Sequence, residues 1–396
     1  MATSLPPQGD SSHIEQAQRL LTPAAWLRLG LAWLVVAGFT LAADGWLGAG
    51  MGPATAGVAF ALLFGTILAA SFGVVHEADH LAHQLGEPYG TLILTLSIVS
   101  IEVILIASVL LGPGHFPTIG RDSIFAVMMI IMNLVIGVCL IMGASRHGDQ
   151  EFNAQGASAY LSMIALLTGV SLVLPNYTSG AGAFSAVQAV GISVVTVLLY
   201  SVFLWMQMRS HRRFFVQPPR GAMAIRVLRR PDPGQQSLSA ARPRDTRALI
   251  VRSVLLLALI LPIVLLSHHL AAVTDYGIAA IGAPPAVGGV LIAIIVFTPE
   301  SITAVKAAMN NEMQRAVNLC LGAFVSTVGL TVPAVLVIGL ITGQPVIMGI
   351  SPAEAALFVV TMVLSMLTFN GQRTSPIQGF MHLAAFAVFA LLLFQP

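Results

Sequence analysis

The chain has 396 residues, of which 57% are hydrophobic and only 9% are charged, and its formal net charge is +2. Soluble proteins carry about 25% charged residues, so this chain lacks the polar side chains needed to cover a surface exposed to water. The composition excludes an ordinary soluble protein and predicts an all-α polytopic membrane protein, whose length is counted in spans of about 20 residues.

The first 27 residues are polar and are predicted to form a cytoplasmic N-terminal segment. The apolar stretch that follows, 28–48, could serve as a signal peptide, but the long polar leader favours an extra N-terminal transmembrane helix. Five further apolar segments have the length that a helix needs to cross the hydrocarbon. They lie at 54–75, 90–111, 122–144, 157–176 and 184–208.

Residues 209–247 differ from the rest of the chain. They carry ten arginines, five prolines and only two acidic residues, Asp232 and Asp245, without apolar periodicity. This pattern predicts a basic cytoplasmic linker, either a solvated loop whose arginines fix topology or a segment that binds anionic lipid. The rear part, 248–396, contains five more apolar segments, at 249–270, 287–309, 313–342, 353–370 and 374–394.

The distribution of positive charge predicts the orientation of these eleven helices. With the linker in the cytoplasm, alternation places the N-terminus in the cytoplasm and the C-terminus outside. Of the 18 Lys and Arg residues, only Arg121 then falls in an outside loop. Because cytoplasmic loops of membrane proteins are enriched in Lys and Arg, we expect a multi-pass protein of the plasma membrane, the inner membrane in a bacterium.

A faint internal repeat divides the helices into two sets of five. A shift of 198 residues places Glu102 on Glu300 and Gly90 on Gly288. Five is an odd number, so the set at 54–208 and the set at 248–396 cross the membrane in opposite directions. The sequence therefore predicts two inverted five-helix repeats behind one extra helix, with a binding site near the bilayer midplane.

Glu102 and Glu300 are the two acidic residues well inside predicted spans. An ionised carboxylate at the bilayer centre costs about 3 kcal/mol on insertion scales, so two at matching repeat positions indicate function. One alone could be a protonated, hydrogen-bonded structural residue. Two nearby carboxylates in low dielectric can hold protons or a cation, and a divalent cation that binds them releases protons. This is the coupling that an antiporter needs.

Two carboxylates offer at most four oxygens, whereas calcium takes six to eight ligands, so other groups must assist. Pro299 inside its helix predicts a helix break that frees the carbonyl of Ile295. Hydroxyls and amides near the two glutamates are weaker candidates, because Ser and Thr are common packing residues in membrane helices. They include Ser97, Ser100, Thr298, Ser301, Thr303, Asn133, Ser326 and Thr327.

Residues 76–80 read His-Glu-Ala-Asp-His and fit the zinc protease pattern H-E-x-x-H. An intramembrane zinc protease is therefore the alternative from another class. Against it, His83 would be an unusually close third ligand, and the two buried glutamates would have no role. We favour Glu77 and Asp79 as part of a polar cytoplasmic mouth for ion access.

The segments 85–108 (LGEPYGTLILTLSIVSIEVILIAS) and 297–335 (FTPESITAVKAAMNNEMQRAVNLCLGAFVSTVGLTVPAV) carry a family resemblance. They resemble the two alpha-repeats of the calcium/cation–proton antiporters, and most of all the bacterial calcium/sodium–proton antiporter branch of the cation/calcium exchanger superfamily. The likeness extends over about residues 54–394. It implies ten core helices in two inverted repeats, with one acidic residue of the transport site in each repeat.

Position by position, the resemblance assigns these acidic places to Glu102 and Glu300. It places Asn133 on an amide position of the first repeat and Ser326 on a position often held by Gln. Many family members have Gly-Asn-Ala-x-Glu in each repeat, and this chain lacks both Gly-Asn pairs. The resemblance makes calcium the first expectation for the exported cation. The missing Gly-Asn pairs remove polar ligands and leave sodium or potassium as the alternative.

The resemblance and the buried carboxylates together predict alternating access, in which inward protons drive cation export. The expected partners are the lipid bilayer, the transported cations and protons. No bound cofactor and no nucleic acid are expected, and the sequence does not indicate an oligomeric state.

Overall fold

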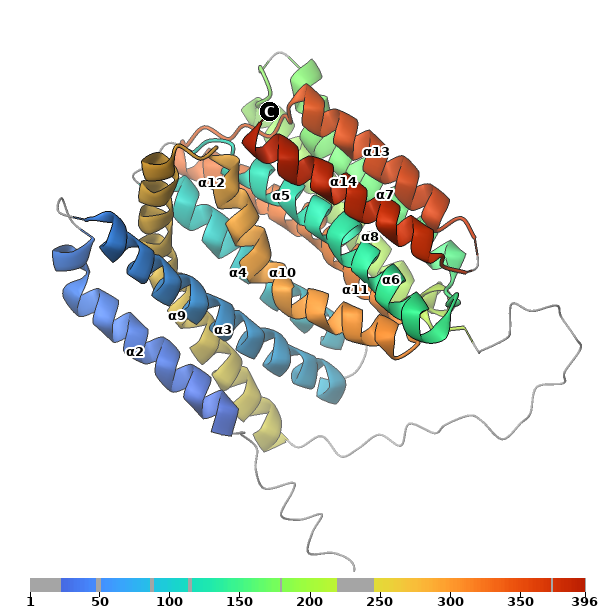
Figure 1. Cartoon of the computed structure of the whole chain (residues 1–396), viewed down its shortest axis with the longest axis horizontal. Coiled ribbons are helices and arrows are strands. Elements are labelled where there is room, and N and C mark those ends of the chain that lie inside the picture. Colours follow the sequence, from blue (N-terminus) through green and yellow to red (C-terminus); the bar gives the residue numbers. More distant parts are fainter. Residues whose placement is uncertain are drawn as a thin grey trace, which may run out of the picture.

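The computed structural model describes residues 23–47, 51–85, 89–112, 116–178, 180–218, 246–371 and 373–395. The front part begins with α2, followed by a set of helices that cross the molecule in alternating directions (Figure 1). Their bounds are α2 Pro23–Trp46, α3 Pro53–Leu85, α4 Tyr89–Leu110, α5 Ile119–Met129, η1 Ile130–Val135, α6 Ile136–His147, α7 Ala154–Thr168, η2 Gly169–Val173, η3 Leu174–Tyr177, α8 Ala186–Met208 and η4 Arg212–Phe215. The predicted N-terminal segment lies outside the described residues up to position 22, and its last residues belong to α2.

The rear part repeats this plan. Its elements are α9 Thr246–Ile281, α10 Ala286–Met309, α11 Met313–Ser326, η5 Thr327–Thr331, α12 Val332–Thr342, α13 Pro352–Thr368 and α14 Pro376–Phe394. In the described residues, ten helical spans are long and apolar enough to cross a membrane, and α13 is a shorter apolar helix of 17 residues. This confirms the predicted all-α polytopic membrane fold, with α3 and α9 longer than their apolar cores.

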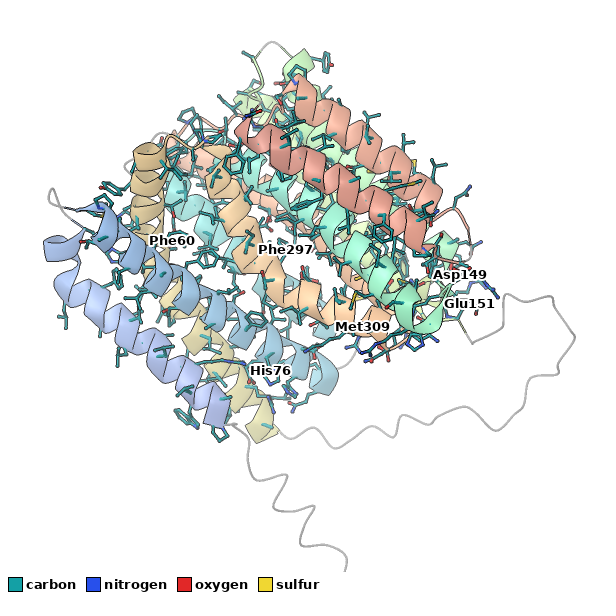
Figure 2. The ribbon with its side chains drawn as sticks, viewed as in Figure 1. Phe60, His76, Asp149, Glu151, Phe297 and Met309 are labelled. Atoms are coloured by element: carbon teal, nitrogen blue, oxygen red, sulfur yellow. The ribbon has the colours of Figure 1, made fainter. Side chains whose placement is uncertain are left out.

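Hydrogen bonds at the ends of helices and in the loops define two faces of the molecule. On the first, called the linker face because residues 209–218 lie there, Gln150 donates to the carbonyl of Ala308, and His147 bonds to the carbonyl of Met309. On the opposite face, the Ile347 amide donates to the carbonyl of Pro117. His76, Asp149, Glu151 and Met309 all lie on the linker side in Figure 2. α3 and α10 therefore end at the linker face, whereas α4 and α9 begin there.

The two sets of helices are thus inverted relative to each other, and their details match. η1 and η5 are π-helical turns that interrupt the third span of each set, between α5 and α6 and between α11 and α12. A π turn leaves the regular hydrogen-bond ladder locally and is frequent at functional sites. In the second set, Pro333 is the second residue of α12, which follows η5, and its missing N–H cannot donate to the carbonyl of Gly329.

The sets meet where α3 packs against α9 and where α10 packs against α5 and α6. The span Ile119–His147 is the most buried of those described. In contrast, α8 exposes a row of valines, including Val187, Val190 and Val194. Lipid is the natural partner of such a face, because its side chains have no other apolar cover.

Arg121 is the one basic residue that the charge distribution places outside. Its Nε donates to Asp122 Oδ1 at 2.9 Å, and its Nη1 donates to the carbonyl of Gly349 at 2.6 Å. Its side chain is only 20% exposed. This cation serves the local tertiary structure, which explains how the first turn of α5 accommodates it.

The close approach of α10 to α5 generates a prediction. A Cβ added to Gly289 would lie 2.6 Å from backbone atoms of Asp122 and Ser123, so Gly289→Ala must push the two helices apart. We expect a loss of about 1–3 kcal/mol of stability, measured as a lower unfolding temperature of the purified protein in detergent. In Gly191→Ala, a control within α8, the added Cβ meets open space, and no loss is expected. Equal stability of the two variants would contradict this packing.

Candidate ion-binding site

Glu102 lies near the middle of α4 and its side chain is fully buried. Thr327 and Thr331, the first and last residues of the π turn η5, donate hydrogen bonds to its Oε2 at 3.0 and 2.8 Å. The other oxygen, Oε1, is buried and has no hydrogen-bond partner among the described residues. One side of the carboxylate is thus held in place, and the other is free to take a proton or a cation.

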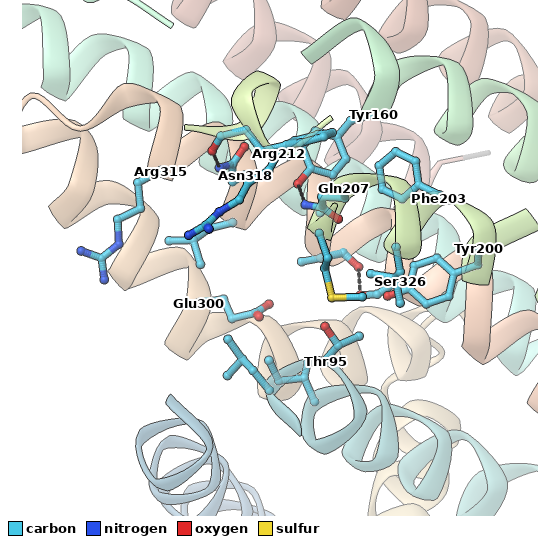
Figure 3. Close-up of a pocket in the computed structure, with 18 of the residues that line it drawn as sticks. Thr95, Tyr160, Tyr200, Phe203, Gln207, Arg212, Glu300, Arg315, Asn318 and Ser326 are labelled. Atoms are coloured by element: carbon cyan, nitrogen blue, oxygen red, sulfur yellow. Dashed lines mark hydrogen bonds between the residues drawn. The ribbon is translucent and has the colours of Figure 1, made fainter. Parts of the chain in front are cut away.

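Glu300 holds the corresponding position in α10, and its Oε2 is likewise buried without a described hydrogen-bond partner. Its carboxylate points into a cavity of about 380 Å³ (Figure 3). α4, α8 and α11 contribute to the lining of the cavity, which includes Thr95, Tyr200, Gln207 and Ser326. The exposed Arg315 also lines it, so the cavity extends from Glu300 to the linker face.

The helices that carry the two carboxylates, α4 and α10, pack against each other. Glu102 and Glu300 both lie in the interior of these helices, away from their ends. Glu102 is fully buried and Glu300 is half-buried at the cavity, so keeping both carboxylates ionised inside the bundle is costly without a compensating positive charge. Protons or a bound cation can supply that charge, and each would displace the other. The structure therefore brings together the two residues that the sequence singled out.

Asn133 lies in η1 and is fully buried, but its partners are not the glutamates. Its amide nitrogen donates to Thr361 Oγ1 at 2.9 Å, and its oxygen bonds to His382 Nδ1 at 3.2 Å. It does not line the cavity at Glu300. Asn133 as a direct ion ligand stays a prediction, and in this conformation the residue ties the π turn to α13 and α14.

Ser326 does line the cavity beside Glu300, with its hydroxyl donating to the carbonyl of Ala323 at 2.6 Å. Ser100 and Thr298 lie two residues before the glutamates, and both hydroxyls donate to carbonyls of their own helices, Leu96 and Ile294. Their lone pairs remain available, so a supporting role of all three in ion binding stays a prediction.

The predicted helix break at Pro299 is wrong. α10 continues without interruption from Ala286 to Met309, with Pro299 inside it. One missing N–H removes a single bond of the helical ladder, and the helix tolerates this loss within the packed bundle. The interruptions of regular helix near the site are instead the π turns η1 and η5.

Glu77 is 3% exposed and forms an ion pair with Arg252 of α9, with Arg252 Nη1 2.8 Å from Glu77 Oε2. Asp79 is half-buried on the same helix. Neither residue lines the cavity at Glu300, so their role in cytoplasmic ion access stays a prediction. The carboxylate of Glu77 already has a cationic partner in this conformation.

The zinc interpretation finds no support. The rings of His76 and His80 lie edge to face, with centroids 4.6 Å apart. Among the described side chains, which do not include that of His83, there is no group of three or more His, Cys, Asp or Glu that could hold a metal ion. The glutamate that would act as the base of a protease, Glu77, is engaged by Arg252.

Sequence reasoning missed Thr331, whose hydroxyl makes the shorter bond to Glu102. The internal repeat could have indicated Thr331 as a site residue, because the shift of 198 residues places Asn133 on Thr331. Sequence reasoning also treated residues 209–218 only as linker. In the structure they pack at the cavity mouth, where Asn318 Nδ2 donates to the carbonyl of Phe215 and Asn153 Nδ2 donates to that of Arg213. The rest of the predicted linker, up to residue 245, lies outside the described residues.

Comparison with known proteins identifies the class to which this fold and site belong. The model of the sodium/calcium exchanger protein family matches residues 55–209 and 252–395, so the chain belongs to that family. This confirms the resemblance seen in the sequence, and the chain is a multi-pass membrane protein of the exchanger class.

Individual relatives are similar over most of the chain. The sodium-potassium/proton antiporter ChaA of Escherichia coli is 31% identical over 328 residues, covering 83% of this chain and 86% of that protein. A calcium/proton antiporter of Aphanothece halophytica is 23% identical over 276 residues, covering 67% and 72%. The solved structure of native YfkE has a TM-score of 0.70 at 18% identity, covering 94% of this chain and all of the other, and this likeness concerns the fold.

The bond from Thr331 to Glu102 generates a prediction. Thr331→Val keeps the shape of the side chain but removes a donor to a buried carboxylate, which is worth about 2 kcal/mol. We expect cation binding to the purified protein to weaken by about thirty-fold, measured by calorimetric titration. Thr331→Ser restores the donor and should bind almost normally. Unchanged affinity in Thr331→Val would show that this hydroxyl does not shape the site.

Proposed function

We propose that this protein is a cation–proton antiporter that works by alternating access. The observation that carries the proposal is a pair of carboxylates at matching positions of two inverted repeats, each with one buried oxygen that lacks a described hydrogen-bond partner. At the linker face, a cation reaches Glu300 through the cavity of about 380 Å³. The cation replaces protons there, and the inverted repeat supplies the equivalent conformation open to the opposite face.

We further propose that the linker face is cytoplasmic, with the N-terminus inside and the C-terminus outside, in the inner membrane of a bacterium. The arginines of residues 209–247 support this orientation through the positive-inside rule. Inward protons then drive export of the cation from the cytoplasm.

For the transported ion, the charge of the site favours calcium. Two carboxylates together match a divalent cation, and Thr327 and Thr331 hold one of them in a fixed orientation. The second candidate, sodium or potassium, is supported by the 31% identical relative, which is named a sodium-potassium/proton antiporter. The missing Gly-Asn pairs also reduce the number of oxygen ligands below what calcium prefers.

Neutralising either glutamate tests the exchange mechanism. Glu102→Gln and Glu300→Gln each remove a group that must alternate between proton and cation, so we expect at least about a hundred-fold loss of cation-driven proton movement in inside-out vesicles. Asp149→Asn, which removes an exposed carboxylate of the linker face, should leave exchange intact. Normal exchange in both glutamine variants would overturn the proposed function.

An ion series decides between the two cation classes. Proteoliposomes with a fixed pH gradient would receive calcium, sodium or potassium in turn, with a pH-sensitive dye reporting proton movement. Calcium specificity predicts half-maximal exchange at a calcium concentration at least about a hundred-fold below that for sodium or potassium, because two carboxylates attract a divalent ion more strongly. Half-maximal exchange at a lower concentration of sodium or potassium than of calcium would assign the protein to monovalent cation transport.

A further inference from the structure

A second pair of acidic residues follows the same repeat. The interval of 198 residues that separates Glu102 from Glu300 also separates Glu77 from Asp275. Glu77 lies in the linker-face half of α3, and Asp275 lies in the opposite-face half of α9. These two helices open their repeats and pack against each other. The inverted plan thus places one carboxylate towards each side of the membrane.

The two carboxylates differ in their partners. Glu77 is neutralised by Arg252 at 2.8 Å. Asp275 has no ion pair in the described residues, and its Oδ2 is buried without a hydrogen-bond partner. A buried carboxylate oxygen without a donor is costly, so its presence in a membrane helix calls for a functional reason. The state shown here leaves that oxygen ready to accept a proton.

Asp275 also lines a cavity between α4, α9 and α10, the helices that connect it with both glutamates. The cavity holds about 20 Å³, enough for one water molecule. Thr274 and Ser267 share the lining, and neither they nor the other lining residues provide a second titratable group. His268, His269 and Tyr276 belong to the same helix but are not part of the lining.

Polar groups continue from this cavity towards the central site. Ser267 hydrogen-bonds to Ser108 of α4. Ser108 lies six residues after Glu102 on the same helix, which corresponds to about 9 Å along the helix axis. The buried side chains of Leu105, Ile292 and Ile295 line the cavity. Along α4 and α10 they are the lining residues nearest in sequence to Glu102 and Glu300. This half of the molecule is closed by apolar side chains, while the cavity at Glu300 extends to the linker face.

We propose that Asp275 is the ion-access residue of the opposite face, through which protons reach Glu102 and Glu300 and the cation leaves. The ligand is a proton or a small cation, and the inference rests on the proposed exchange function and orientation. In the alternate conformation, separation of Leu105 from Ile292 and Ile295 opens the path from Asp275 to the two glutamates. Glu77 holds the corresponding repeat position near the linker face, and in this conformation its carboxylate is neutralised by Arg252.

Side-specific kinetics of the full-length protein test this proposal. In inside-out vesicles the face of Asp275 points to the lumen, and cation uptake is measured against lumenal pH at fixed bath pH. We expect Asp275→Asn to require about a ten-fold higher lumenal proton concentration for half-maximal exchange, because a carboxylate at a mouth concentrates cations and protons. The half-saturating cation concentration in the bath should stay unchanged. Asp275→Glu should restore the wild-type lumenal dependence.

Glu354→Gln is the matched control. Glu354 is an acidic residue of the same face and lines a different cavity, between α5, α10, α13 and α14. We expect Glu354→Gln to leave unchanged both the lumenal proton concentration and the bath cation concentration that give half-maximal exchange. The proposal is overturned if Asp275→Asn behaves like wild type, if it changes bath and lumenal dependence equally, or if Glu354→Gln alone produces the lumenal shift. An absence of cation–proton exchange in the wild-type protein would instead refute the proposed function, so the two failures can be told apart.

Discussion

The electrostatic cost of carboxylates in a low-dielectric interior is the constraint on which this structure depends. Glu102 and Glu300 sit in the middle of apolar helices, where an unpaired charge is strongly unfavourable. The protein satisfies Glu102 only in part, through Thr327 and Thr331. The remaining demand for positive charge must be met by protons or by a cation, and this requirement couples the two ligands without any direct contact between them.

The inverted repeat explains how such a site can serve both sides of a membrane. The same set of helices occurs twice in opposite orientations, and its π turns η1 and η5 occupy matching positions. The two halves are not in the same state, however. A cavity leads from the linker face to Glu300, whereas the buried side chains of Leu105 and Ile295 line the small space at Asp275. If the linker-face half closed and the opposite half opened, the two glutamates would become accessible from the other side of the membrane.

The sequence predicted the span order, the inversion and the central glutamates, because each depends on local patterns or on the cost of burying charge. It could not predict the partners of Asn133, since Thr361 and His382 lie more than 200 residues away in the chain. Pro299 indicated a break that the packed helix α10 does not have. Residues 209–218 lack apolar periodicity, yet hydrogen bonds to distant residues such as Asn318 order them at the cavity mouth.

Counting the protons released when a cation binds tests whether protons and the cation compete for the pair Glu102 and Glu300. Purified protein would be titrated with the transported cation by calorimetry, in buffers of different ionisation enthalpy at one pH. Competition at the carboxylate pair predicts a net release of protons, at most two for each cation bound, and a smaller release when the pH is high enough to ionise the site beforehand. Cation binding without proton release across the whole pH range would contradict the account.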